Sequence, residues 1–331
     1  MKKIWNLLLS ILIFYWGWKF FDWAFVRAVW QPDPQACRAA SGACWGFIAE
    51  KHRLIAFGTY PYEEHWRPAL SSALLVALWV LSAIRAFWKP RLIVIWAAGL
   101  TVIGVLMWGG VFGLPYVENE RWGGLVLTLL LTTFGLAFAF PLGILLALGR
   151  RSELSLVRAL CVAYIELIRG VPLISVLFMA SVMLPLFLPA GVSIDKLLRA
   201  QIALILFAAA YLAEVVRGGL QAIPKHQYEA ADALGLGYVQ KTLFIVLPQA
   251  LRIAVPPLVN TCIGFFKDTS LVLIIGLFDL LSTIKLSLND PAWTGFGVEA
   301  YLFAALLYFA FSYAMSLYSR RLEVSAGRSG R

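Results

Sequence analysis

Charged residues are scarce in this chain of 331 residues, where Asp, Glu, Lys and Arg make up 14% of the sequence. A soluble globular domain carries about 25%. Hydrophobic residues account for 61% and the mean hydropathy is +0.80, so a lipid bilayer is the expected solvent. The net charge of +10 does not indicate a nucleic-acid-binding protein, because the basic residues lie between apolar runs instead of on one basic face.

Motifs for catalysis and for phosphate binding are missing as well. The sequence has no G-x-x-x-x-G-K-[ST] loop, so we expect no ATP to bind to this chain. It has neither H-E-x-x-H nor C-x-x-C, and its three histidines, His52, His65 and His226, all lie in predicted loops. An intramembrane enzyme needs metal ligands or a nucleophile and base within its spans. We therefore expect no metal, no cofactor and no catalytic residue.

Only four cysteines occur. Cys161 and Cys262 lie in predicted membrane spans, where they are most simply packing residues. Cys37 and Cys44 share a long loop, residues 27–67, between the first two predicted spans. A disulfide between them is one interpretation if the loop faces an oxidising compartment, and two unpaired thiols are the other.

Long apolar runs are abundant, and a run of about 20 residues suffices to cross a bilayer. The first run follows Met1, Lys2 and Lys3, but it is too long and too aromatic for a signal peptide and no small-residue cleavage site follows closely. We interpret it as a retained span. The sequence predicts about eight spans, near residues 5–26, 68–87, 92–114, 123–148, 158–189, 197–216, 253–279 and 298–318.

Basic residues set the expected orientation. With a cytoplasmic N-terminus, more than half of the 28 Lys and Arg residues fall on the cytoplasmic side, as the positive-inside rule requires. Acidic residues accompany the basic ones in outer loops such as 116–122. Eight spans return the C-terminus to the cytoplasm, where residues 321–331 form a basic tail.

The chain divides near residue 120 into two regions. Residues 1–120 hold three spans and the long outer loop 27–67, and they contain no motif that carries chemistry. Residues 121–320 hold five spans with unusual interruptions. No internal repeat is visible, so an ion-driven secondary transporter built from inverted repeats gains no support.

One interruption lies in 158–189, which is too long for a single span. A helix of that length would measure about 48 Å against a hydrocarbon core of about 30 Å. Glu166, Arg169, Gly170 and Pro172 lie within it, and Pro172 cannot donate to the helix ladder. We predict a break there. Glu166 and Arg169 share a helix face, so they either line a path or gate, or neutralise each other structurally.

The second interruption lies in 253–279, where Pro256 and Pro257 are followed by polar residues between apolar flanks. Charges within a span usually face a bundle interior or a cavity. A translocation path or gate is one interpretation, and mutual neutralisation of the charged pair is the other. The polar residues are Asn260, Lys267, Asp268, Thr269 and Ser270.

The connection 217–252 is too polar for a span, and Arg217 and Arg252 flank it. Pro224 is suited to beginning a helix, Glu229–Leu234 is a run of helix formers, and Gly235 is suited to ending it. A second short helix is predicted at about 238–246, ended by Pro248. Small side chains on an exposed helix let a partner surface approach closely, so the connection is interpreted as a cytoplasmic docking element.

The spacing of Glu229-Ala230-Ala231, Gly235, Ile245 and Leu247-Pro248 resembles the EAA loop of permease subunits in bacterial ABC importers. The surrounding segments, including "ELIRGVPLISVLF" from Glu166, resemble the polar amino-acid uptake family. His226 stands where that family usually has Gly. The whole chain is similar to the M-type permease subunit of general L-amino-acid ABC transporters.

This resemblance implies an all-α integral membrane fold, with a type I importer core at 121–320 and three additional N-terminal helices. It implies ATPase subunits that use ATP and Mg, a second permease subunit that is a homologous heteromeric partner, and a periplasmic amino-acid-binding protein. Membrane lipid is the remaining partner, no nucleic acid is expected, and the location is the bacterial inner membrane. Residues 229–235 would couple the permease to the ATPase. An amino-acid zwitterion needs both a cation and an anion, or helix ends, to replace its water, and Glu166, Arg169, Lys267 and Asp268 are the candidates for this contact. An ABC permease for another solute, such as a sugar or an anion, and an ion-driven secondary transporter remain the alternatives.

Overall fold

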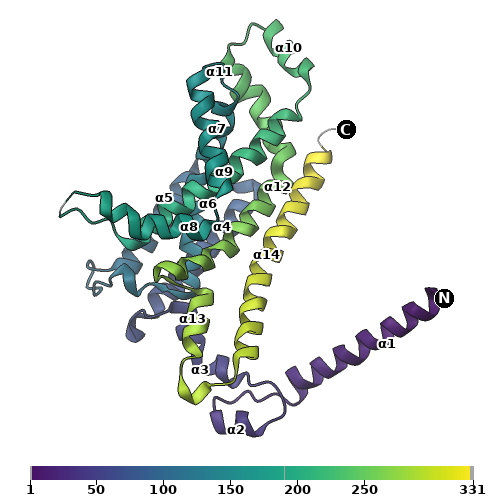
Figure 1. Cartoon of the computed structure of the whole chain (residues 1–331), viewed down its shortest axis with the longest axis vertical. Helices are drawn as coiled ribbons and strands as arrows, with labels where there is room; N and C mark the ends of the chain where they lie inside the picture. Colours follow the sequence, from purple (N-terminus) through teal and green to yellow (C-terminus); the bar gives the residue numbers. More distant parts are fainter. Residues whose placement is uncertain (1, 190, 329–331) are drawn as a thin grey trace.

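Helices form almost the entire chain. The structure, a computed structural model, describes residues 2–189 and 191–328 (Figure 1). The α-helices and the short strand are α1 Lys2–Phe21, α2 Pro34–Ala39, α3 Gly46–Phe57, α4 Trp66–Ala83, α5 Arg91–Trp108, α6 Gly124–Arg150, α7 Ser155–Gly170, α8 Leu173–Phe178, α9 Lys196–Gln221, α10 Lys225–Ala233, α11 Tyr238–Gln240, α12 Leu247–Asp268, β1 Phe278–Asp279, α13 Leu280–Ser287 and α14 Gly297–Arg328. Part of the predicted basic tail, residues 329–331, lies outside the described residues.

Seven helical segments in the described part of the chain are long and apolar enough to cross a membrane. An eighth span is broken: α7 and the segment Leu173–Phe187 meet at an angle of 104°. Val171 and Pro172 between them are extended, because the ring of a proline disfavours helical geometry in the residue before it. The predicted number of spans and the predicted break in 158–189 are both confirmed.

Helix α12 corrects the expectation for 253–279. The chain is helical from Tyr238 to Ile275, and α12 passes through Pro256 and Pro257 without a break. Membrane helices tolerate proline because neighbouring groups can satisfy the carbonyls that it leaves without a helical partner. The helix changes only at Thr269, where the 3₁₀ helix η8 Thr269–Ile275 begins and then ends at Gly276 in the left-handed region.

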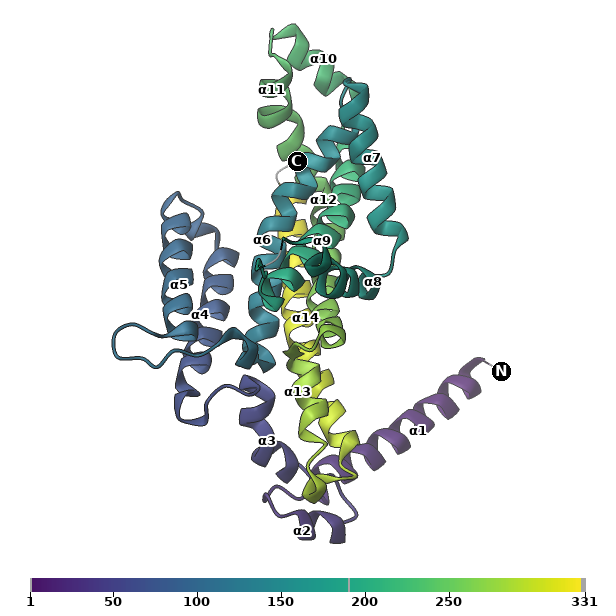
Figure 2. The same cartoon turned by 60° about the vertical axis from the view of Figure 1, so that its left-hand side comes forward.

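The centre of the bundle is the contact between α6 and α9, with α12 packed beside α9 and α14 beside α12 (Figure 2). Small residues bring α6 and α9 close together. A Cβ placed at Gly143 would lie 2.9 Å from Leu212 Cβ and 3.1 Å from Ala209 O. Membrane helices associate through such small-residue contacts, because lipid provides no hydrophobic driving force.

Residues before α6 form three separate structures, namely helix α1, a cap at residues 27–67 and the α4–α5 hairpin. The α4–α5 hairpin packs against α6, and the buried Arg67 guanidinium holds its far end by donating to Leu106 O and, at 2.9 Å, to Pro115 O. Helix α1 instead points away from the bundle (Figure 1, purple). An apolar stretch of 18 residues within Lys3–Val26 has no buried residue, so its side chains are available to lipid or to another subunit.

Residues 27–67, expected as a loop, form a compact cap that contains α2 and α3. Cys37 and Cys44 are joined by a disulfide in this cap, with their Cα atoms 5.4 Å apart. The cap packs against α13 and the start of α14. Cys44 N donates to Glu299 Oε1 at 3.1 Å, and Arg38 Nη2 donates to Ala292 O at 3.0 Å.

The cap also holds the connection between α13 and α14 by charge. Lys51 Nζ lies 2.6 Å from Asp290 Oδ2, and this hydrogen bond holds the pKa of the exposed Asp290 carboxyl below its usual range. A carboxyl with a lowered pKa stabilises the fold above its unfolded pKa and loses this effect as the pH falls through the folded value. The contact is therefore present at neutral pH.

Reduction of the disulfide is expected to loosen the cap. Cys37 and Cys44 close a loop of about eight residues, for which chain entropy predicts about 2.5 kcal/mol of stabilisation. We expect dithiothreitol, or Cys37→Ser with Cys44→Ser, to increase hydrogen exchange in residues 27–67. The core helices α6 and α9 are the internal control, and equal exchange in the cap with and without the disulfide contradicts the prediction.

A buried carboxylate ties α13 to the bundle. Asp279 accepts hydrogen bonds from Ser282 N at 3.1 Å, Leu281 N at 3.2 Å and Tyr308 OH of α14 at 3.1 Å. Thr128 of α6 accepts from Leu280 N at 3.0 Å. The turn before α13 therefore joins α6 and α14.

Candidate functional site

The connection 217–252 forms a two-helix projection at the end of the molecule opposite the disulfide cap (Figures 1 and 2). Helix α10 begins directly after Pro224, which is extended, and α11 follows a short turn. We call residues 224–246 the coupling element. Its position beyond the ends of α6, α9 and α14 leaves it free to contact a partner.

Gly235 ends α10 in the way that the sequence predicts. Its φ is +71°, in the left-handed region that glycine adopts without strain. Gly235 N donates to Asp232 O at 2.9 Å, and Leu236 N donates to Ala231 O at 3.2 Å. These two bonds form a Schellman motif, which satisfies carbonyls that the helix end leaves open.

The second helix continues further than predicted. After α11 the chain forms the π-helix η7 Lys241–Val246, which leads directly into α12. Pro248 does not end a helix; it lies in the first turn of α12. A proline is accepted there because the wider π turn already shifts the hydrogen-bond register that proline would interrupt. The coupling element is thus continuous with a membrane span.

The side chains of the coupling element face two directions. Ala231 is 2% exposed, so the expectation that it contributes to an exposed small-residue surface is wrong. Glu229, Ala230 and Gly235 are exposed, and Leu234 at the turn is 77% exposed. A large apolar side chain that is this exposed at a helix end, next to small residues, marks a contact surface for another protein.

Three side-chain contacts tie α10 to the spans. The Asp232 carboxylate forms an ion pair with Lys241 of η7. Gln249 of α12 donates to Gln227 Oε1 at 3.2 Å and to Ile245 O at 2.8 Å. Displacement of α10 therefore moves α12 with it.

The third contact reaches α6 and α9. Arg151, at the end of α6, donates to Tyr228 OH of α10 at 3.1 Å and to Leu220 O of α9 at 3.3 Å. Neither Arg151 nor Tyr228 is among the residues that the sequence predicts for the site. The remaining predicted residues are Ile245 and Leu247, which are partly buried, and Pro248, which is exposed.

Glu166 and Arg169 belong to a cluster of charges among α6, α7 and α9. Arg150 Nη1 lies 2.9 Å from Glu166 Oε1 and 2.7 Å from Glu214 Oε1. Glu214 Oε2 lies 2.8 Å from Arg217 Nη2 and 3.5 Å from Arg169 Nη1. We call these five residues the ion-pair cluster. Three guanidinium groups converge on Glu214, whose side chain is 15% exposed.

This arrangement corrects the interpretation that Glu166 and Arg169 neutralise each other. Each pairs with a residue of a neighbouring helix, so the charges join three helices instead of one helix face. Glu214 and Arg150 were missed. Glu214 lies within a predicted span, and a carboxylate inside a span is itself a signal of a functional site, which could have identified it.

The other predicted path residues do not join the cluster. Pro172, Asn260 and Lys267 are exposed, and Asp268 and Ser270 are partly buried. Thr269 is fully buried and donates to Phe266 O at 2.7 Å. These residues lie at or near two helix boundaries, since α8 begins after Pro172 and η8 begins at Thr269. The two boundaries are close in space, because α8 packs against η8.

The described residues contain no group of three or more His, Cys, Asp or Glu that could hold a metal ion. The site combines a contact surface joined to several spans with a cluster of three arginines and two glutamates between α6, α7 and α9. Such an arrangement can receive and transmit a displacement.

A family model described as the binding-protein-dependent transport system inner membrane component matches residues 139–324. The chain belongs to this family. The match covers more than half of the chain and includes both the coupling element and the ion-pair cluster. As a member of this family, the chain is a multi-pass membrane component of a transport system that depends on a binding protein.

Individual relatives agree with the family assignment. The inner membrane amino-acid ABC transporter permease protein YhdY of Escherichia coli (strain K12) is 52% identical over 91% of this chain and 83% of its own length. The glutamate/glutamine/aspartate/asparagine transport system permease protein BztC of Rhodobacter capsulatus is 39% identical over 93% and 83%. A crystal structure of an amino acid ABC transporter with histidines matches 61% of this chain and 92% of its own, at 29% identity and a TM-score of 0.54.

Proposed function

We propose that this chain is the permease subunit that carries L-amino acids through an ATP-driven, binding-protein-dependent importer of a bacterial inner membrane. The observation that carries the proposal is the coupling element, an exposed two-helix projection tied to three spans by Arg151, Lys241 and Gln249. The named functions of relatives such as YhdY support amino acids as the substrate class.

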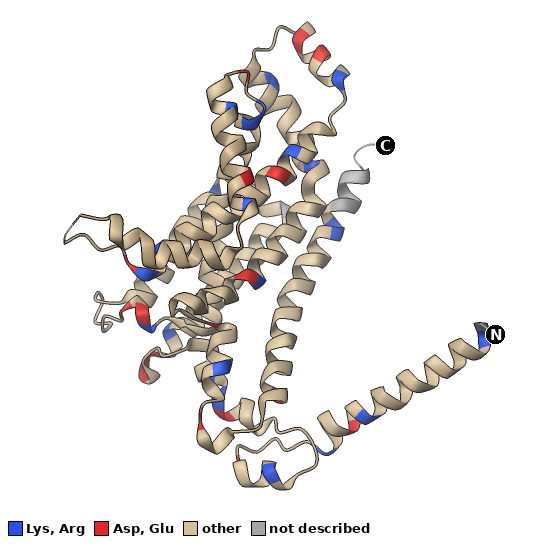
Figure 3. Cartoon of the chain, in the orientation of Figure 1, with Lys and Arg blue, Asp and Glu red and all other residues tan. Residues whose placement is uncertain are grey.

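The two ends of the molecule support an orientation. A disulfide is expected on the oxidising side of the inner membrane, so the cap with Cys37 and Cys44 faces the periplasm. The coupling element lies at the opposite end, and therefore in the cytoplasm. The described end of α14 lies toward the coupling element (Figure 1), in agreement with a cytoplasmic C-terminus. Basic residues also gather toward this end, in and around the coupling element and near the described end of α14 (Figure 3).

ATP and Mg act on a separate ATPase subunit, whose surface receives the exposed residues Glu229, Ala230 and Leu234. When ATP closes the ATPase dimer, α10 moves with it. The Asp232–Lys241 pair and Gln249 pass this displacement to α12, and Arg151 passes it to α6 and α9. The spans then change from an inward-open to an outward-open arrangement.

The ion-pair cluster is suited to holding one of these arrangements. Its charges come from α6, α7 and α9, so rocking of α7 against α9 separates Arg169 from Glu214 and Glu166 from Arg150. An amino-acid zwitterion carries both charges and can compete with such pairs. We assign this cluster to the translocation path or its gate.

Two further partners follow from the proposal. A second permease subunit, homologous to this chain, completes the translocation path that the exposed Asn260 and Lys267 face. A periplasmic amino-acid-binding protein docks at the end that carries the disulfide cap. Selection among amino acids is then divided between that protein and the path.

Reconstitution into proteoliposomes tests the proposal. We expect uptake of radiolabelled L-amino acids only when the chain is combined with its partner permease, the ATPase subunit, ATP and the binding protein. Vesicles that lack the ATPase are the matched control. Uptake by this chain alone, driven by an ion gradient, contradicts the mechanism, and ATP-driven uptake of a sugar or an inorganic anion in place of amino acids contradicts the substrate class.

A further inference from the structure

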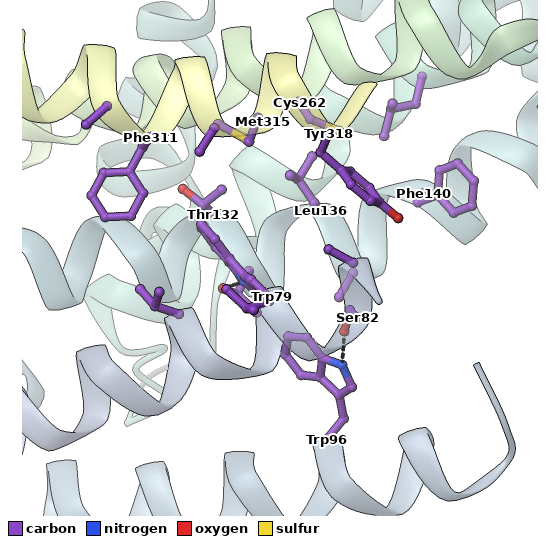
Figure 4. A pocket seen from close by; sticks show the side chains of 18 residues that line it. Trp79, Ser82, Trp96, Thr132, Leu136, Phe140, Cys262, Phe311, Met315 and Tyr318 are labelled. Atoms are coloured by element: carbon purple, nitrogen blue, oxygen red, sulfur yellow. Dashed lines mark hydrogen bonds between the residues drawn. The ribbon is translucent and has the colours of Figure 1, made fainter. Parts of the chain in front are cut away.

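A cavity of about 820 Å³ lies between the α4–α5 hairpin and the helices α6, α12 and α14 (Figure 4). It separates the hairpin from the part of the chain that the family shares. Its wall includes the large apolar side chains of Trp79, Trp96, Leu136, Phe140, Phe311 and Met315. The volume is in the range of about 300–1,000 Å³ that is typical of ligand pockets.

The indole N–H groups of Trp79 and Trp96 already donate hydrogen bonds within the protein, and so do the hydroxyls that accept from them. Trp79 Nε1 donates to Thr133 Oγ1 at 3.0 Å, and Trp96 Nε1 donates to Ser82 Oγ at 2.8 Å (Figure 4). The hydroxyls of Thr133 and Ser82 each donate to a backbone carbonyl of their own helix. A polar solute would gain little from these groups, so the cavity favours a hydrocarbon ligand.

Small side chains on α4, α6 and α14 leave the space that the cavity occupies. Ala310 and Ala314 lie one turn apart on α14, Ala137 lies on α6, and Ala83 ends α4. Val80 and Phe140 in the same wall are 54% and 37% exposed, so the cavity is continuous with the surface that the bilayer covers. Because an unfilled apolar space loses dispersion contacts, lipid hydrocarbon is the filling that this surface provides.

Basic residues lie beside one end of the cavity. Trp88, in the turn between α4 and α5, donates to Ser82 O at 2.7 Å, which holds this turn next to a residue of the wall. The exposed residues Lys89 and Arg91 follow it in the chain. On the opposite wall, the exposed Arg321 lies three positions after the lining residue Tyr318, and therefore on the same face of α14. Anionic headgroups are attracted to basic residues at the end of a span.

We propose that this cavity is a binding site for a phospholipid with an anionic headgroup. One acyl chain fills the space between Trp79, Trp96 and Met315, and the phosphate lies near Lys89, Arg91 and Arg321. The lipid thereby joins the α4–α5 hairpin to the core. This inference does not depend on which solute the transporter carries.

Photo-crosslinking tests the site directly. The transporter, purified in its assembled form, is reconstituted with phosphatidylglycerol that carries a diazirine on one acyl chain, and adducts are located by peptide mass spectrometry. We expect adducts in residues 76–83 and 310–318. In Ala314→Trp, which fills the cavity, we expect these adducts to fall at least fivefold.

Ala305→Trp is the matched control, because Ala305 is exposed on the same helix and does not line the cavity. Its adducts in 76–83 are expected to equal those of the wild type. Ala310→Leu fills less of the space, and it is used if the Ala314 variant fails to assemble. Unchanged adducts in the filled variants overturn the proposal.

Two other outcomes also overturn it. Adducts on a helix of a partner subunit, with none in residues 76–83, would show that protein occupies the cavity. Equal labelling by a zwitterionic diazirine phospholipid, unchanged in Lys89→Gln with Arg91→Gln, would contradict the assignment of an anionic headgroup.

Discussion

Replacement of Gly235 by valine is expected to reduce ATP-driven uptake at least tenfold while the chain still inserts into the membrane. Gly235 has a φ of +71°, and a β-branched residue in this region costs at least 1–2 kcal/mol. Space is not the cause, since an added Cβ would meet no atom within 4 Å. The strain falls on the turn that follows α10, so the Schellman bonds open and the contact surface changes shape. Uptake into proteoliposomes, with co-purification of the ATPase subunit, measures the effect.

Gly237→Val is the matched control two residues away. Gly237 has a φ of −65°, which any residue adopts, and a Cβ there would meet only Gln240 Oε1 at 4.0 Å. Uptake close to that of the wild type is expected. Equal activity in both variants, or equal loss in both, would show that the geometry of the α10 turn does not control coupling.

The membrane spans could be predicted well because their signal is local. An apolar run of sufficient length specifies a span without any knowledge of its neighbours. The break in 158–189 was also predictable, since Pro172 and the residue before it restrict the backbone by themselves. Pro256 and Pro257 carry the same local signal in α12 and produced no break, because the surrounding helices decide whether the freed carbonyls are satisfied.

Contacts between distant residues account for most of what the sequence did not predict. The partner of Glu166 is Arg150, and that of Arg169 is Glu214, 45 positions along the chain. The spacing along α7 suggested that Glu166 and Arg169 pair with each other, but the packing of α6, α7 and α9 gives each of them a partner on another helix. The cap at 27–67 was interpreted as a loop because α2 and α3 are short, and their stability comes from Asp290, Trp293 and Glu299, more than 200 residues later.

Neutralisation of Glu214 by Glu214→Gln is expected to abolish uptake and to lower the free energy of unfolding by about 2–3 kcal/mol. Glu214 is the carboxylate on which Arg150, Arg169 and Arg217 converge, and its removal leaves Glu166 as the only acidic member of the ion-pair cluster. Three guanidinium groups around a neutral amide repel one another. Thermal unfolding in detergent and uptake into proteoliposomes measure the two effects.

Two further variants separate a specific role of Glu214 from a general loss of negative charge. Glu153→Gln removes a carboxylate that is exposed in the turn after α6, and we expect uptake close to that of the wild type.

Addition of Arg169→Gln to Glu214→Gln restores the net charge that the cluster has in the wild type, so part of the lost stability is expected to return. If this double variant is as stable as Glu214→Gln alone, repulsion among the arginines is not the cause. If Glu153→Gln loses as much uptake as Glu214→Gln, the pairing of three arginines with Glu214 has no specific role in transport. Partial recovery of stability without recovery of uptake is the result we expect, because the double variant lacks Arg169, which we propose to be part of the translocation path or its gate.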